Sequence, residues 1–258
     1  MRDQINAFLS NDSSFGKLMT KIGIIIGANL MFVLFSLPVV TMGAAWTALC
    51  HVMLKTLRSD GVLNPFRQFW VGFRGNFKQA TIAWIAALAL VAFGYVDVQI
   101  CLGADGWVSE IRYVIYALGA LLVIVLIYLF PTMAAFENTL PSLISSSLYF
   151  AMRKPGKLLV LLFFHVFPMA LTYSDAQDLP LYAFLWSFFG FGAIAMLSAR
   201  LLLPEFKPYL PLVDSSGDFI LDENGQRQTL GEQSEPADHD SHEKSEKEIL
   251  EEMRKLGM

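Results

Sequence analysis

The sequence predicts an all-α membrane protein: a polytopic bundle of about six transmembrane helices at residues 1–205, followed by a partly disordered acidic tail at 206–258. Two observations predict this fold. Of the 258 residues, 55% are apolar and 16% are charged, whereas soluble domains carry about 25% charged residues. The charges are also grouped between long apolar runs instead of being spread along the chain. We therefore expect a lipid bilayer to be the main partner of this chain.

Segment length defines the individual spans. A bilayer core about 30 Å thick needs about 20 apolar residues in helical form, because lipid cannot satisfy bare backbone groups. Four runs meet this length clearly, and a fifth, 158–173, is short but almost wholly apolar. The four clear runs are 22–40, 79–103, 113–136 and 181–203.

Residues 41–58 leave two alternatives open. This segment is either a short sixth span or a segment that enters the membrane and returns. The basic residues favour six spans with both termini in the cytoplasm, because all 19 lysines and arginines except Arg112 then lie on the inner side. The outer loops are then short, at about 38–42, 104–112 and 174–180. We expect the inner connections, 64–78 and 139–156, to be amphipathic helices at the membrane surface.

The character of the chain changes after Pro204. Residues 214–230 have the pattern of two short extended pieces around a polar turn. Residues 231–242 have the composition of a disordered linker, and 245–258 form a short amphipathic helix that is marginal on its own. We expect this cytoplasmic tail helix to order on a partner or on the membrane.

Two ionisable residues within the spans are candidates for a polar membrane site, Asp97 and His165. Each also has a structural interpretation: Asp97 lies near the outer boundary in contact with water, and His165 is a neutral imidazole bonded to a neighbouring helix. We interpret Cys50 and Cys101 as small core residues, because neither has a metal-ligand partner at suitable spacing.

The sequence contains no motif that predicts catalysis. It has no catalytic triad, phosphate-binding glycine loop or zinc-protease motif. The tail residues His239, Asp240 and His242 resemble a loose metal cluster, but a polar tract without fixed geometry is more often simply solvated. We therefore expect no enzyme, no metal and no cofactor, and no nucleic-acid partner.

The N-terminal half carries a recognisable pattern. It consists of ANLMFVLFSLPVVTMGAAWTALCHVMLK from Ala28 to Lys55, then FRQFWVGFRGNFKQA at 66–80, with FPTMAAFENTL at 130–140. This pattern resembles the YesL family of predicted bacterial integral membrane proteins. The resemblance implies a multi-pass protein of the bacterial cytoplasmic membrane, encoded near carbohydrate ABC importers and without an assigned reaction. Its most specific stretch marks an interaction or packing motif of Pro38, Thr41, Gly43 and Trp46.

Three functional hypotheses follow. The first is an accessory membrane subunit that binds the permease subunits of a sugar ABC transporter through helix–helix and cytoplasmic-loop contacts. The second is an independent small secondary transporter or channel. A weak sequence similarity between the segments after Pro38 and Pro131, which would indicate an internal repeat, supports it, together with Asp97 and His165. The third is a membrane scaffold that acts through its tail.

Overall fold

The computed structural model describes residues 14–59, 63–174 and 177–210, and the regular elements in these ranges are helical. This result confirms the all-α prediction. The chain divides into two compact units, Met1–Glu205 and Phe206–Met258. Residues 211–258 lie outside the described ranges, and with them the predicted extended pieces, the tail helix and the cluster at His239, Asp240 and His242.

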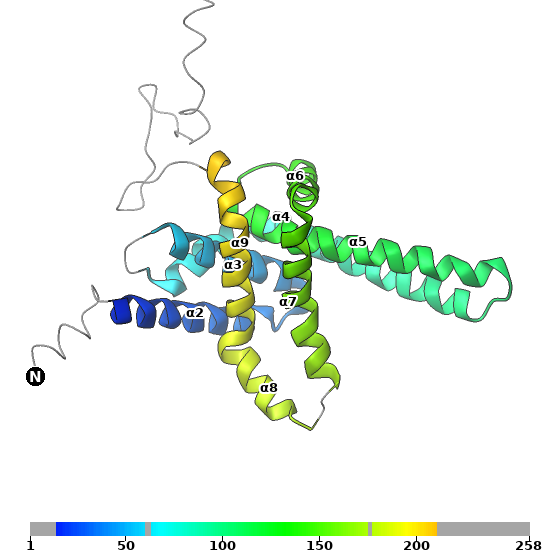
Figure 1. Cartoon of the computed structure of the whole chain (residues 1–258), viewed down its shortest axis with the longest axis horizontal. Helices are drawn as coiled ribbons and strands as arrows, with labels where there is room; N and C mark the ends of the chain where they lie inside the picture. The colour runs from blue at the N-terminus through cyan, green and yellow to red at the C-terminus, as the bar shows by residue number, and fades with distance from the viewer. Residues whose placement is uncertain (1–13, 60–62, 175–176, 211–258) are drawn as a thin grey trace, which may run out of the picture. The chain divides into compact units, whose positions relative to one another are not determined.

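The elements follow one another through short connections (Figure 1). A π-helical turn, η2, interrupts the last long helix between α8 and α9. In chain order the elements are α2 (Ser14–Ser36), η1 (Val39–Thr41), α3 (Met42–Arg58), α4 (Pro65–Leu102), α5 (Trp107–Ala135), α6 (Leu140–Arg153), α7 (Pro155–Ser174), α8 (Leu179–Leu185), η2 (Trp186–Gly190), α9 (Phe191–Phe206) and η3 (Lys207–Tyr209).

Five of the described helices are long and apolar enough to cross a membrane: Gly16–Ser36, Pro65–Leu102, Trp107–Ala135, Pro155–Ser174 and Leu179–Tyr209. Each overlaps one of the five apolar runs that the sequence predicts as spans, and the first ends at Ser36, before the predicted end of the run at residue 40. Together they indicate a multi-pass membrane protein. Helix α3, the segment that the sequence left open, has 17 residues and falls short of that length.

The helix boundaries follow local sequence signals. Asn64 caps α4 by accepting hydrogen bonds from the backbone N–H groups of Phe66 (3.1 Å) and Arg67 (3.2 Å), and Pro65 occupies the first helical position. Thr139 precedes α6 as the sequence predicts, and α6 ends at Arg153. Residues 65–78 do not form a separate surface helix, however: they are continuous with the span, because no helix-stopping signal separates them from Leu102.

The core of the Met1–Glu205 unit lies around α3, which packs against α2, α4 and α5. Small side chains line much of its surface and let the neighbouring helices approach closely. The buried apolar residues of α3 are Ala44, Ala45, Ala48, Leu49, Cys50, Val52, Met53 and Leu54. Cys50 and Cys101 are both buried and unpaired, which confirms them as core residues.

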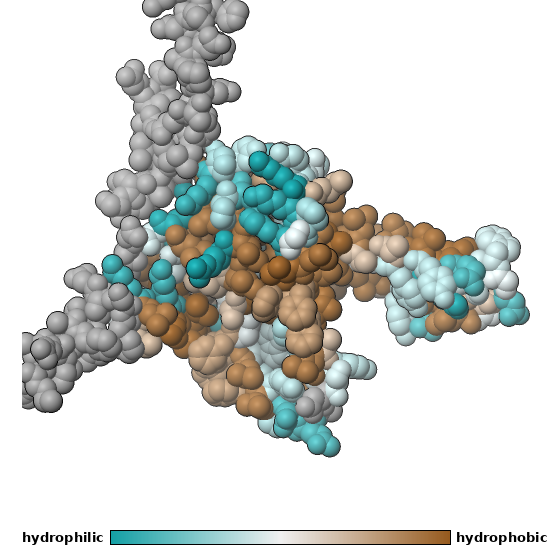
Figure 2. Space-filling view, viewed as in Figure 1, coloured by the Kyte–Doolittle hydropathy of each residue, from teal (hydrophilic) through white to brown (hydrophobic). Residues whose placement is uncertain are grey.

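Helices α4 and α5 lie side by side as an antiparallel hairpin (Figure 1). The rings of Trp84 and Phe130 meet where the hairpin belongs to the core. The end of the hairpin at the α4–α5 loop extends beyond the other described helices (Figure 1), and we refer to residues 85–126 as its outer part. No residue of α5 before Ile127 is buried. Figure 2 shows that apolar side chains cover much of this hairpin and that polar residues gather at its tip.

Candidate functional site

The turn between α2 and α3 holds Pro38 and Thr41 of the predicted motif, and Gly43 follows in the first turn of α3. The hydroxyl group of Thr41 donates to the carbonyl oxygens of Phe35 (2.6 Å) and Pro38 (2.9 Å). From α4, the indole N–H of Trp84 donates to the carbonyl oxygen of Val39 at 2.7 Å. Side chains therefore act as hydrogen-bond donors to three backbone carbonyls at the point where the regular backbone hydrogen bonds of α2 end.

Gly43 marks the closest approach of α3 to α4. A Cβ atom added at Gly43 would lie 2.5 Å from Trp84 Cβ and 2.9 Å from the backbone oxygen of Ala80. Both atoms are fixed by the backbone of α4, so no side-chain movement makes room. The glycine is therefore a packing device of the kind that lets membrane helices touch.

Trp46 and His165, which the sequence places in separate candidate sites, meet in one aromatic cluster. The ring of Trp46 lies 5.9 Å from that of His165, 5.5 Å from that of Phe32 and 6.5 Å from that of Phe191. His165 Nδ1 lies 2.8 Å from the carbonyl oxygen of Leu161. The predicted bond of His165 to a neighbouring helix is therefore wrong, because the imidazole reaches back one turn along its own helix.

Asn29 joins α2 to the π-helical turn of the last span, and the sequence analysis missed it. Its side chain is fully buried. The amide nitrogen donates to the carbonyl oxygens of Trp186 (3.0 Å) and Ser187 (2.6 Å), and the amide oxygen accepts from the backbone N–H of Gly192 (2.7 Å). A π-turn disturbs the regular backbone ladder and occurs often at functional sites, and here Asn29 supplies partners for three backbone groups.

A signal for this contact was present in the sequence. Asn29 is the single amide in the apolar run 22–40, and a polar residue inside a span is expected to bond to another helix. What the sequence does not give is the partner, which lies 157 to 163 residues farther along the chain.

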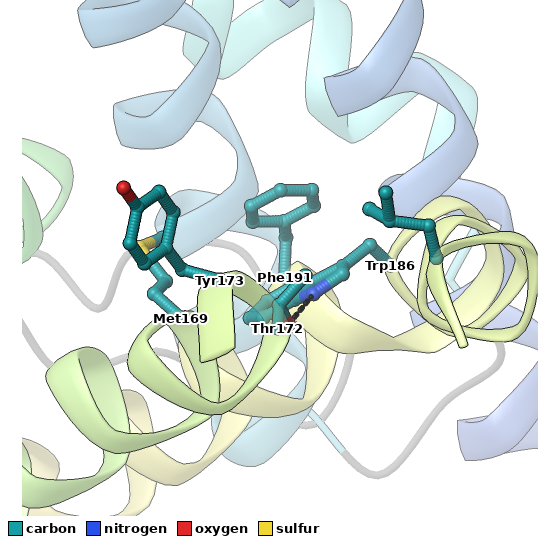
Figure 3. Close-up of a pocket in the computed structure, with 6 residues that line it drawn as sticks. Met169, Thr172, Tyr173, Trp186 and Phe191 are labelled. Carbon is teal, nitrogen blue, oxygen red and sulfur yellow. Dashed lines mark hydrogen bonds between the residues drawn. The ribbon is translucent and has the colours of Figure 1, made fainter. Parts of the chain in front are cut away.

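A shallow pocket of about 340 Å³ opens beside the π-helical turn (Figure 3). Its walls are mainly apolar, and the indole N–H of Trp186 donates to the hydroxyl oxygen of Thr172 across its floor at 2.9 Å. The lining residues are Met169, Thr172, Tyr173, Leu179, Trp186 and Phe191. The surface suits an apolar group, since its main polar pair is already satisfied.

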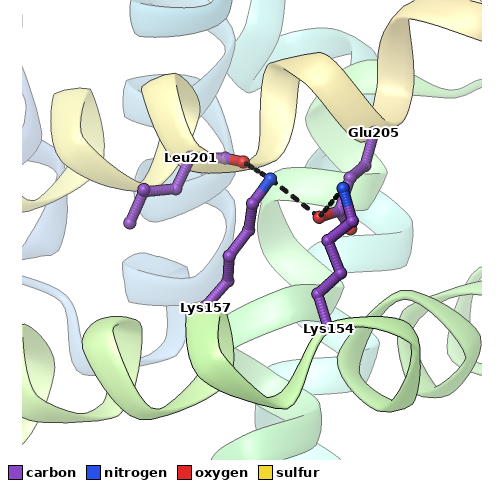
Figure 4. Close-up of polar contacts among 4 residues, drawn as sticks. All are labelled: Lys154, Lys157, Leu201 and Glu205. Carbon is purple, nitrogen blue, oxygen red and sulfur yellow. Dashed lines mark hydrogen bonds and ion pairs between the residues drawn. The ribbon is translucent and has the colours of Figure 1, made fainter.

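A charged cluster joins the start of α7 to the end of α9 (Figure 4). Lys157 Nζ lies 2.8 Å from the Glu205 carboxylate and donates to the carbonyl oxygen of Leu201 at 2.7 Å, while Lys154 Nζ lies 3.9 Å from the same carboxylate. The Glu205 side chain is 3% exposed. Burying a carboxylate is costly unless a cation accompanies it, so Lys157 offsets the cost of burying Glu205 and links α7 to α9.

Asp97 lies apart from these contacts, on the outer part of α4 and about five residues before its end at Leu102. Its side chain is half-buried. The two residues of the predicted polar membrane site, Asp97 and His165, are therefore not brought together.

Several of the described contacts join helices: the Asn29 amide and the Trp84 indole donate hydrogen bonds to backbone carbonyls of other elements, aromatic rings from different helices meet edge to face, and the Lys157–Glu205 ion pair joins α7 to α9. In the comparison with protein families, residues 25–98 match a family described as "Protein of unknown function, DUF624". No curated protein and no solved structure matches the chain.

Proposed function

We propose that this protein is an accessory subunit of a carbohydrate ABC importer in a bacterial plasma membrane, and that it acts by binding permease helices. The observation that carries the proposal is the outer part of the α4–α5 hairpin, in which Ala87 and Cys101 are the only buried residues of α4 and α5. The partner class comes from the resemblance to the YesL family. The match to a family of unknown function over residues 25–98 is compatible with this proposal and does not name a reaction.

The exposed surface of the hairpin is large and apolar. Leu90 is 60% exposed, Phe93 is 68% exposed and Leu118 is 60% exposed. Lipid can cover such side chains, but helix association in a bilayer uses small residues that let backbones approach. Gly119 offers such a place on α5, because no heavy atom lies within 4 Å of a Cβ atom added there.

Asp97 adds a polar group to the same surface. In the described part of the chain no hydrogen bond or ion pair of its carboxylate is found, and carboxylates within membrane segments usually pair with a second polar group. A donor on a permease helix would supply that group.

The experiment is affinity purification of the tagged full-length chain from native membranes, with the recovered proteins identified by mass spectrometry. We expect permease subunits with the wild-type chain. Gly119→Leu places a side chain in the proposed interface and should reduce their recovery about tenfold, because overpacking costs about 1–3 kcal/mol.

Gly75→Leu is the matched control. Gly75 also has no heavy atom within 4 Å of an added Cβ atom, but it lies on the inner part of α4. If the wild-type chain is recovered without permease subunits, the proposal is refuted. If Gly119→Leu and the wild-type chain recover equal amounts of permease subunits, the assignment of the interface to this face is refuted. If vesicles that hold only this chain transport a sugar, the independent-transporter hypothesis replaces ours.

A further inference from the structure

We propose that the shallow pocket beside the π-helical turn is a binding site for one acyl chain of a membrane phospholipid. The pocket lies between α7 and the last span, and its volume is about 340 Å³. This volume is at the lower end of the range for small-ligand sites, about 300–1,000 Å³. The site is separate from the α4–α5 hairpin and does not depend on the identity of any partner subunit.

The Trp186 side of the pocket is held in place by its neighbours. The indole N–H donates to the hydroxyl oxygen of Thr172, and the indole ring lies 4.7 Å from the ring of Phe191. One turn later, Gly190 leaves room for the indole, because a Cβ atom added there would clash with the ring. The backbone carbonyl of Trp186 accepts from Asn29. The pocket is therefore preformed, and a ligand does not lose affinity by ordering these side chains.

The pocket offers few free hydrogen-bonding groups. The hydroxyl group of Thr172 accepts from Trp186 and donates to the carbonyl oxygen of Pro168 at 2.8 Å. The only other polar side-chain atom among the six lining residues is the hydroxyl of Tyr173, which points away from Trp186 and Phe191 (Figure 3). None of the six is charged. A sugar or an ion would lose water here without gaining partners, whereas an alkyl chain has no polar group to desolvate.

The mouth of the pocket opens onto a surface that hydrocarbon covers. Tyr173 is 91% exposed, Leu179 is 51% exposed and Met169 is 50% exposed. Helix α7 and the segment Leu179–Tyr209 are both long and apolar enough to cross a membrane. Exposed apolar residues continue from the pocket along α7 and α8, namely Val166, Phe167, Leu171, Leu181 and Phe184. The pocket is thus continuous with the lipid-facing surface, and an acyl chain can enter it without crossing water.

Polar residues flank the pocket where α7 ends and α8 begins. Tyr173 is followed by Ser174, the last residue of α7, and Asp178 directly precedes Leu179. Tyrosine and tryptophan are enriched at the boundary between hydrocarbon and headgroups. A zwitterionic phospholipid brings a cation that can approach Asp178, whereas a free fatty acid brings a carboxylate that Asp178 repels. The charge therefore favours a phospholipid over a free fatty acid.

Large side chains make the pocket unsuited to a partner helix. Membrane helices approach one another over small residues such as glycine, alanine, serine and threonine. Thr172 is the only small residue among the six that line the pocket, and its hydroxyl already bonds to Trp186. A thin, flexible alkyl chain can follow the uneven surface between such side chains, whereas a helix cannot approach it closely.

The test uses a zwitterionic phospholipid that carries a photoactivatable diazirine at the end of one acyl chain. The purified full-length chain in a maltoside detergent is titrated with this probe and illuminated, and the labelled residues are mapped by mass spectrometry. Labelling at a binding site saturates, whereas chance contact within the micelle rises in proportion to the probe. Leu171 reports the chance contact, because it is 45% exposed on α7 and does not line the pocket.

We expect labelling at Tyr173 and Leu179 to saturate, while labelling at Leu171 rises linearly. Met169→Trp places an indole in the pocket and should lower labelling at Tyr173 at least about fourfold, the change for one methylene group that is no longer buried. Leu171→Trp is the matched control and should leave it unchanged. An excess of the unlabelled phospholipid should displace the probe, and a fatty acid with the same chain should not.

Three results would overturn the proposal. Labelling at Tyr173 that rises linearly, as at Leu171, would show chance contact only. Equal labelling of Met169→Trp and Leu171→Trp would place the bound chain elsewhere, and displacement by the fatty acid but not by the phospholipid would identify a different occupant. Both substitutions lie at exposed positions, so gel filtration should match the wild-type chain, and the saturation measurement on the wild-type chain needs no variant.

Discussion

Replacing Asn29 with leucine should destabilise the bundle by about 2 kcal/mol. Leucine has a similar size but cannot bond to Trp186, Ser187 or Gly192, so three hydrogen bonds between α2 and the last span are lost. Hydrogen bonds between membrane helices contribute about 0.6 kcal/mol each on average, which gives the figure of about 2. Backbone groups that stay buried without partners would raise the cost.

The assay is equilibrium unfolding in mixed micelles, followed by tryptophan fluorescence. Asn76→Leu is the matched control, because Asn76 donates to the Gly72 carbonyl oxygen within its own helix, at 3.2 Å, and joins no second helix. We expect its effect to be within about 0.5 kcal/mol, as for substitutions away from interhelical contacts. If Asn29→Leu is no more destabilising than Asn76→Leu, Asn29 does not join α2 to the π-helical turn and the reasoning fails.

Three further changes test other contacts by the same unfolding measurement. Gly43→Ala should cost about 2 kcal/mol, because its Cβ atom would meet fixed atoms of α4, whereas Gly23→Ala has open space and should be neutral or better; equal effects would contradict the close approach. Lys157→Met should cost about 3 kcal/mol by leaving Glu205 without its nearest cation, while Lys154→Met should cost little; a larger effect at Lys154 would show that the ion pair is assigned wrongly. Trp84→Phe should cost about 0.6 kcal/mol through the lost bond to Val39, and a stabilised variant would argue against that bond.

Much of the fold follows from local sequence. Each of the five apolar runs is long enough to predict a helix, and signals such as Asn64–Pro65 and Thr139 place helix starts within a residue or two. The burial of Cys50 and Cys101 also follows from their apolar surroundings. These features depend on hydrophobicity and capping, which act over a few residues.

The contacts between helices could not be predicted in the same way. Nothing within 22–40 indicates that Asn29 meets a π-helical turn, because the partner groups are backbone atoms that any sequence presents. Whether α3 spans the membrane was left open, because 17 residues are too few for a clear span and too many for a loop. The extent of α4 was misjudged because charges within 65–78 indicate a surface segment, although nothing there ends a helix.

The candidate site was predicted in part. Gly43 and Trp46 lie at helix contacts, as a packing motif requires, and Trp46 contacts His165 across two helices. Asp97 was grouped with His165 only because both are ionisable residues in apolar runs, and ionisability alone gives no position. The roles of Asn29, Trp84 and Lys157 depend on partners that are 44 or more residues away in sequence. They therefore emerge only from the packed bundle.

Membrane extraction tests the central claim most directly, since the account requires hydrocarbon around most of residues 16–209. Membranes from cells that express the full chain are washed at alkaline pH, which releases peripheral proteins, and are then treated with a mild detergent. We predict that the chain sediments with the washed membranes and is recovered as a folded, monodisperse protein only in detergent. A folded chain in the detergent-free supernatant would contradict the account.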